Sequence, residues 1–103
     1  MELAPGVVVD ENAVRSFCRA HGIRWLGLFG SGLRGQLRPD SDLDLLVEFE
    51  PGRSPGLLRL AEFELELGRL LGRDVDLRTP GDLSIYFRDD VARTARPLYD
   101  AAA

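Results

Sequence analysis

The sequence predicts an α+β domain in which a small β-sheet is packed with helices. Residues 23–29, 42–49 and 73–78 are rich in apolar strand-forming side chains, and the segments between them repeat apolar residues at helical spacing. The expected α/β-like order is helix-strand-helix-strand-helix-strand-helix, with three or more strands in one sheet. A length of 103 residues is close to the commonest domain size, so we expect residues 1–103 to form a single domain.

Composition excludes several classes of protein. Hydrophobic residues make up 45% of the chain, enough for a small core, and no apolar run is long enough to span a bilayer. The N-terminal segment lacks the basic region of a secretory signal, and a single cysteine cannot form an internal disulfide. We therefore expect a cytoplasmic protein without a membrane partner. A net charge of −4 argues mildly against direct nucleic-acid binding, because nucleic-acid binders usually carry a basic face.

The first helix is expected over residues 10–21. Asp10 is a suitable N-cap, and Gly22 is a suitable C-terminal stop. Cys18 is expected to be buried in this helix, and His21 to be a solvated helix end rather than a ligand.

The first strand is predicted over residues 23–29, directly after this helix. Alternation of side chains along a strand sends successive residues to opposite faces of the sheet. The two expected faces consist of Ile23, Trp25 and Phe29 against Arg24 and Leu28.

The longest helix is predicted over Leu57–Leu71. Its apolar positions cover an arc of about 240°, interrupted by Glu64, whereas a simple surface helix needs only about 100°. Two interpretations remain open: a helix wedged between the sheet and a neighbouring helix, or a surface for a partner or a second copy of the chain.

The last part of the chain is expected to contain one strand and one helix. The strand, residues 73–78, is followed by a turn over residues 79–82. The helix is predicted within residues 86–95, with Phe87 and Val91 facing inward. No further element is expected before the alanine tail.

A glycine-rich turn follows the first strand and matches three known motifs only superficially. Gly30-x-Gly32-x-x-Gly35 has the spacing of a dinucleotide-binding loop, but too few residues precede the next strand for a helical crossover. A Walker A loop needs Lys where Gln36 stands. A calcium loop beginning at Asp40 lacks its glycine and its final glutamate. None of these motifs is supported.

Carboxylates on two neighbouring strands predict a metal site. Asp42 and Asp44 leave the same face of one strand, while Leu43, Leu45 and Val47 occupy the other. A solvated polar face would explain one such pair. Asp76 repeats the feature on the next strand, and acidic residues are unfavourable in strands. Three acids in this arrangement are suited to Mg²⁺, which prefers oxygen ligands.

The turn at Gly30 and Ser31 could bind phosphate. Backbone amides at such a turn, together with a serine hydroxyl, are suitable donors to the terminal phosphates of a nucleotide. A pair of metal ions beside them could activate the attacking oxygen and stabilise the leaving pyrophosphate.

These residues carry a family resemblance. Gly30-Ser31, Arg34-Gly35, the segment from Ser41 to Phe49, and Gly72-Arg73-Asp74-Val75-Asp76-Leu77 together resemble the core of the minimal nucleotidyltransferases of the DNA polymerase β-like superfamily. The resemblance spans nearly the whole chain, and the combined motif is specific.

The resemblance implies roles for individual residues. Asp42 and Asp44 would bind two Mg²⁺ ions, and Asp76 would bind one of them and help to activate the acceptor hydroxyl. Gly30 and Ser31 would hold the β- and γ-phosphates of ATP. Arg34 would either contact phosphate or pair with an acidic neighbour.

The resemblance also implies a partner. Minimal members often accompany a HEPN-domain protein as an antitoxin, and some transfer AMP to a tyrosine of that partner. The leading hypothesis is therefore a Mg²⁺-dependent enzyme that transfers a nucleotide, AMP from ATP, to a hydroxyl of such a partner. The alternative is a non-catalytic antitoxin that neutralises its partner by binding alone. A homo-oligomer is also possible.

Overall fold

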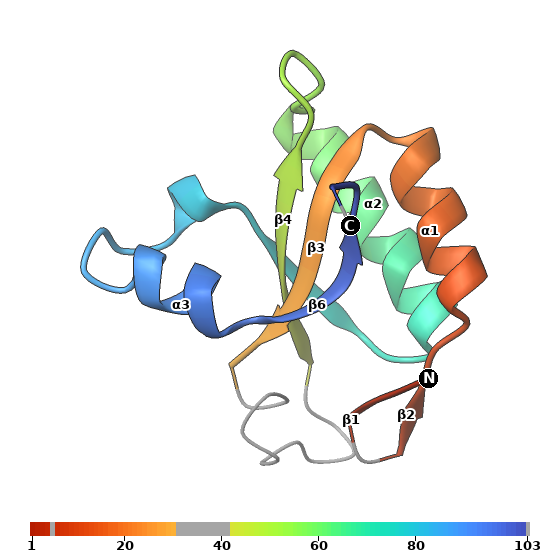
Figure 1. Cartoon of the computed structure of the whole chain (residues 1–103). Helices are drawn as coiled ribbons and strands as arrows, with labels where there is room; N and C mark the ends of the chain where they lie inside the picture. Colours follow the sequence, from red (N-terminus) through yellow and green to blue (C-terminus); the bar gives the residue numbers. More distant parts are fainter. Residues whose placement is uncertain (5, 31–41, 103) are drawn as a thin grey trace.

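The computed structural model describes residues 1–4, 6–30 and 42–102. Its centre is a four-stranded sheet with the order β5-β4-β3-β6 (Figure 1). The strands are β3 (Ile23–Phe29), β4 (Leu43–Phe49), β5 (Val75–Arg78) and β6 (Arg96–Asp100). A separate hairpin near the N-terminus consists of β1 (Glu2–Ala4) and β2 (Val7–Val8). The helices are α1 (Glu11–Ala20), α2 (Leu57–Leu71) and α3 (Arg88–Thr94), with a 3₁₀ turn, η1 (Pro80–Asp82). The predicted α+β class is confirmed.

The sheet is mixed because its connections differ in length. β3 and β4 are antiparallel, as are β3 and β6. β4 and β5 are parallel, and α2 forms the crossover between them. α1 and α2 lie together on one side of the sheet, whereas α3 lies beyond the opposite side (Figure 1). No helix in the described part of the chain is long and apolar enough to cross a membrane.

The core lies between the sheet and the pair α1 and α2. Leu43, Leu45 and Val47 of β4 are fully buried there, as the alternation in the sequence predicted. α1 contributes Val14, Phe17 and Cys18, and α2 contributes Phe63, Leu67 and Leu71. Burial raises the pKa of the Cys18 thiol to about 12, so that it stays protonated at neutral pH.

Both predicted signals at the ends of α1 are present. The Asp10 side chain accepts hydrogen bonds from the backbone of Asn12 and Ala13, at 3.0 and 3.3 Å. Gly22 follows the helix with φ +68°, a left-handed conformation that favours glycine. His21, in contrast, is not a solvated helix end. Its ring packs 4.6 Å from that of Phe63 and is half-buried, with Nε2 3.6 Å from Glu66.

The predicted faces of β3 were wrong in part. Leu26 and Leu28 are buried in the core, while Trp25 and Phe29 are only half-buried. The pairing of β3 with β4 shifts between Ile23 and Trp25, and this irregularity reverses the alternation that a regular strand would follow.

α2 has the predicted bounds, but its apolar arc is only partly covered. Leu57 and Leu58 are each 85% exposed, and Leu65 is 65% exposed. The helix packs against the sheet and beside α1, where its Phe63 contacts Phe17, but this packing leaves these three leucines uncovered. Glu64, the polar residue within the apolar arc, has a structural role. Its Oε2 accepts a hydrogen bond of 2.7 Å from the backbone N–H of Leu77, on the edge strand β5.

The two ends of the chain differ most from the prediction. The hairpin β1–β2 and the strand β6 were not predicted. Leu3 of β1 is buried in the core, and the Arg96 side chain donates to its carbonyl oxygen at 2.9 Å. α3 lies within the predicted range with Val91 half-buried, but Phe87 is 64% exposed rather than inward-facing.

Candidate active site

Two of the predicted acids lie side by side on the sheet. Asp44 of β4 is in register with Asp76 of β5, its parallel neighbour. Adjacent strands are about 4.8 Å apart, so these carboxylates leave the same face at close range. Both residues are half-buried, whereas Leu43 and Leu45 on the opposite face are fully buried. The chain therefore holds two like charges together at the margin of its core, an arrangement that favours a bound cation.

Gly30 brings the backbone directly against Asp44. Its φ of +73° is left-handed, and it immediately follows Phe29, which pairs with Asp44 across β3 and β4. A Cβ atom at this position would collide with the Asp44 carboxylate and would lie 3.2 Å from its Cγ. Glycine is thus required here both by the backbone conformation and by the close approach of the acid.

Arg78 is a further member of the site. Its Nε lies 3.1 Å from Asp76 Oδ1, and its Nη2 lies 3.2 Å from Asp76 Oδ2. The hydrogen bonds to Asp76 and the charge of that carboxylate raise the pKa of Arg78, with smaller contributions from Asp82 and Asp44. The guanidinium therefore lies in the field of three acids.

Asp82 is held in place at the end of this cluster. Its Oδ2 accepts hydrogen bonds from the backbone N–H and the hydroxyl of Thr79, at 3.1 and 3.0 Å. These bonds, with the backbone donor contributing most, lower the pKa of Asp82. The 3₁₀ turn η1 thus keeps a carboxylate charged near Arg78.

Carboxylate oxygens are the ligands that a hard divalent cation prefers. In the described part of the chain, however, the acids are not grouped around one cation position. Asp42 is exposed and precedes β4. Within residues 1–4, 6–30 and 42–102, no three acidic, His or Cys side chains are grouped as metal ligands. Arg78 keeps Asp76 from acting as a metal ligand in this arrangement, because its guanidinium donates hydrogen bonds to both carboxylate oxygens. The all-carboxylate donor set and the close turn at Gly30 fit Mg²⁺ once Arg78 is displaced.

The structure thus brings together Gly30, Asp44 and Asp76 among the predicted site residues. Ser31 and Arg34 lie outside the described residues, so their predicted phosphate contacts stay predictions. The sequence reasoning missed Arg78. The sequence did indicate that Arg78 belongs beside Asp76, because the two residues are two positions apart on one strand and therefore share a face.

Comparison with known protein families identifies the family to which this chain belongs. The model of the nucleotidyltransferase domain matches residues 11–97, so the chain belongs to that family, as a minimal nucleotidyltransferase. The matched range contains every residue of the site described above.

Two sequence relatives are close. Protein adenylyltransferase MntA of Thermococcus cleftensis is 50% identical over 56 residues, 54% of each chain. A Methanocaldococcus jannaschii protein, provisionally named a protein adenylyltransferase, is 36% identical over 75 residues, covering 73% of this chain and 78% of its own. The match to the Thermococcus protein thus spans about half of that relative's length.

Solved structures agree on the fold. A structure provisionally described as a minimal nucleotidyltransferase is 46% identical, with a TM-score of 0.68 over 84% of this chain and 87% of its own. An MNT antitoxin in complex with a tri-AMPylated HEPN toxin, from Shewanella oneidensis, is 22% identical, with a TM-score of 0.62. That match covers 87% of this chain and 69% of the other, and at this identity it supports the fold alone.

Proposed function

We propose that this protein is a Mg²⁺-dependent nucleotidyltransferase that transfers AMP from ATP to a hydroxyl group of a protein partner in the cytoplasm. The observation that carries the proposal is the registered pair Asp44 and Asp76, set against the turn at Gly30. Family membership supports it, because the family uses a nucleoside triphosphate and a divalent metal. The adenylyltransferase relatives support AMP as the transferred group.

Each acid has a role in this proposal. Asp42, Asp44 and Asp76 would hold Mg²⁺, with two ions as the expected number. The bound metal would neutralise phosphate charge and lower the pKa of the acceptor hydroxyl. Gly30 and Ser31 would orient the β- and γ-phosphates through backbone and hydroxyl donors.

The transfer itself needs one bond made and one broken. The acceptor oxygen bonds to the α-phosphorus of ATP, and the bond from that phosphorus to the oxygen bridging it to the β-phosphate breaks, which releases pyrophosphate. The Asp76 carboxylate accepts the hydroxyl proton. Arg78 must leave Asp76 before these events, and its guanidinium is then free to pair with the negative charge of the triphosphate.

The proposed acceptor is a tyrosine of a HEPN-domain toxin, which makes this protein an antitoxin. This choice rests on the resemblance of the sequence motif to the minimal nucleotidyltransferases, and the Shewanella complex, a neighbour in fold, pairs an MNT antitoxin with an AMPylated HEPN toxin. The exposed leucines of α2, Leu57, Leu58 and Leu65, are a candidate surface for that partner.

The direct test is transfer of label from ATP. The protein is incubated with Mg²⁺, ATP labelled at the α-phosphate, and the protein encoded by the neighbouring gene. We expect the partner to acquire label, and the Asp42→Ala/Asp44→Ala double variant to transfer none. Label at the γ-phosphate should not be transferred. Undiminished labelling by the double variant would refute the mechanism.

A second candidate is a non-catalytic antitoxin that acts by complex formation alone. The exposed leucines of α2 favour it, because they could bind a partner without any chemistry at the acids. Co-expression with the toxin separates the two functions. Full protection of cells by a variant with Asp42, Asp44 and Asp76 all replaced by alanine would establish the binding role, and loss of protection with the complex intact would exclude it.

A further inference from the structure

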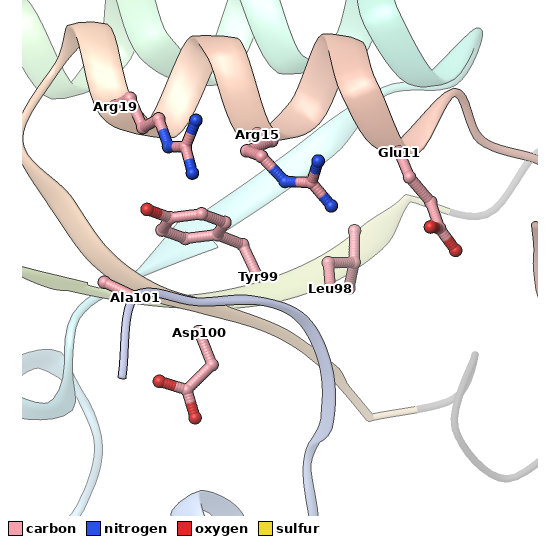
Figure 2. A pocket seen from close by; sticks show the side chains of 7 residues that line it. All are labelled: Glu11, Arg15, Arg19, Leu98, Tyr99, Asp100 and Ala101. Atoms are coloured by element: carbon pink, nitrogen blue, oxygen red, sulfur yellow. The ribbon is translucent and has the colours of Figure 1, made fainter. Parts of the chain in front are cut away.

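A pocket lies away from the acidic site, between α1 and β6 (Figure 2). It has a volume of about 350 Å³, within the range of small-molecule sites. Its wall on the helix side carries Arg15 and Arg19, and its strand side carries Leu98 and Tyr99. β6 is the edge strand at the opposite end of the sheet from β5, and β3 lies between it and β4, the nearer of the two strands that carry Asp44 and Asp76.

Within the described part of the chain, the two arginines of the pocket lack acidic partners. They are four residues apart on α1 and therefore lie on the same face of the helix. Both guanidinium groups point toward β6 (Figure 2). Among the described residues, Arg15 contacts only the neutral side-chain oxygen of Asn12, at 3.4 Å, and neither arginine forms an ion pair.

Four other arginines behave differently. Arg24, Arg59, Arg78 and Arg93 each form an ion pair with a carboxylate at 3.2 Å or less. Two adjacent guanidinium groups without such partners repel each other, and a shared anion relieves that repulsion. The α1 pair differs from these four because two guanidinium groups without an ion pair line the same pocket.

The acids that border the pocket leave its centre positive. Asp100 points away from the arginines (Figure 2), and its Oδ1 accepts a hydrogen bond of 2.9 Å from the backbone of Ala102. Glu11 stands at the far end of the wall, beyond Arg15. A ligand anion between Arg15 and Arg19 therefore meets two positive groups, with one negative group at the rim.

Tyr99 lines the pocket on the side of β6, opposite the helix. It is in register with Leu26, one of the fully buried residues of the core, and in Figure 2 its ring lies below the Arg19 guanidinium, while Leu98 lies below that of Arg15. The ring offers an apolar face beside Leu98, and its hydroxyl offers a hydrogen-bond donor.

We propose that this pocket is a binding site for a phosphate group, held between Arg15 and Arg19 above Tyr99. Guanidinium groups match phosphate in geometry and bind it through paired charge-assisted hydrogen bonds. The phosphate has two possible sources, free phosphate or the phosphate of a nucleotide whose base lies on Tyr99. The site is independent of the proposed transfer reaction, because it shares no residue with the acidic cluster.

Titrations followed by two-dimensional ¹⁵N NMR test this site. The protein carries Asp44→Asn and is kept in a chelator, so that metal-dependent binding at the acidic site does not contribute. Inorganic phosphate, AMP and adenosine are the three probes. We expect phosphate and AMP to shift the Nε–H signals of Arg15 and Arg19 and the amide of Tyr99, and adenosine to leave them unchanged.

Variants make the test specific. Arg15→Gln/Arg19→Gln should weaken phosphate binding about ten-fold or more, because both charge-assisted contacts are lost. Arg69→Gln, on an exposed position of α2, should bind as the parent does. Tighter binding of AMP than of phosphate identifies a nucleotide site, and equal affinities identify a free-phosphate site. The absence of any shift at millimolar phosphate, shifts centred on Gly30, or unchanged affinity in a correctly folded double variant would overturn the proposal.

Discussion

On β4, Leu43, Leu45 and Val47 are fully buried beneath α1 and α2, whereas Asp44 on the opposite face is only half-buried and lies beside Asp76. The buried leucines gain free energy by leaving water. The acids instead place like charges side by side, and the repulsion between them is offset by a nearby positive charge, either the Arg78 guanidinium on Asp76 or a bound cation. In the proposed function, the same strand provides stability on one face and chemistry on the other, so substitutions should separate the two properties.

The largest expected effect is on catalysis, from Asp44→Asn. The rate of AMP transfer should fall about 1000-fold or more, equivalent to about 4 kcal/mol in the barrier, because a charged ligand is lost from the proposed metal site. Labelled-ATP assays measure the rate, and denaturant unfolding should show little loss of stability. Glu48→Gln, on the same strand, is the matched control and should retain full activity. Equal activity of the two variants would contradict a catalytic role for Asp44.

The opposite pattern is expected for Leu45→Ala. Removing a fully buried leucine side chain should lower the free energy of unfolding by about 2–5 kcal/mol. The transfer rate per folded molecule should stay within about two-fold, since this residue faces away from the acids. Urea unfolding gives the stability, and assays at low temperature give the rate. A large loss of activity in fully folded protein would show that the two faces are not separable.

Gly30→Ala should affect both properties. A side chain at φ +73° costs about 1–2 kcal/mol, and its Cβ would displace the Asp44 carboxylate. Gly52→Ala is a matched control, because Gly52 has φ +77° but no atom within 4 Å of the added Cβ. Both variants should lose similar stability, and only Gly30→Ala should lose transfer activity. Normal activity in folded Gly30→Ala would remove the turn from the site.

The smallest expected effect concerns Arg78→Gln. Without its guanidinium, Asp76 no longer has a competing cation, and the affinity for Mn²⁺ should rise about three- to ten-fold, or about 1 kcal/mol. Calorimetric titration measures the affinity. Arg93→Gln removes the ion pair with Asp90 on α3 and should leave Mn²⁺ binding unchanged. An unchanged or weaker affinity in Arg78→Gln would mean that Arg78 does not compete with the metal.

Local sequence patterns predicted most of the core and part of the site. The alternation of Leu43, Asp44 and Leu45 determines the two faces of β4, and the capping residue Asp10 marks the start of α1. β6 escaped prediction because Pro97 is unfavourable in strands and its pairing partner, β3, is distant in sequence.

Other features depended on contacts that no local pattern contains. The reversed faces of β3 result from an irregularity in its pairing with β4, which the spacing of apolar residues cannot reveal. The exposure of Leu57 and Leu58 depends on which elements pack beside α2. The spacing of Asp76 and Arg78 already shows that they share a face of β5. Only the structure shows that the guanidinium contacts both oxygens of the carboxylate.

The most direct test of the metal site is a Mn²⁺ titration followed by broadening of the backbone amide signals. We expect the amides of Gly30, Asp44 and Asp76 to broaden first, and those of Arg15 and Tyr99 to be affected last. Asp44→Asn/Asp76→Asn should abolish the effect while the signals of the buried face remain in place. Broadening centred elsewhere, or unchanged in the double variant, would contradict a divalent-metal site on the acidic face of the sheet.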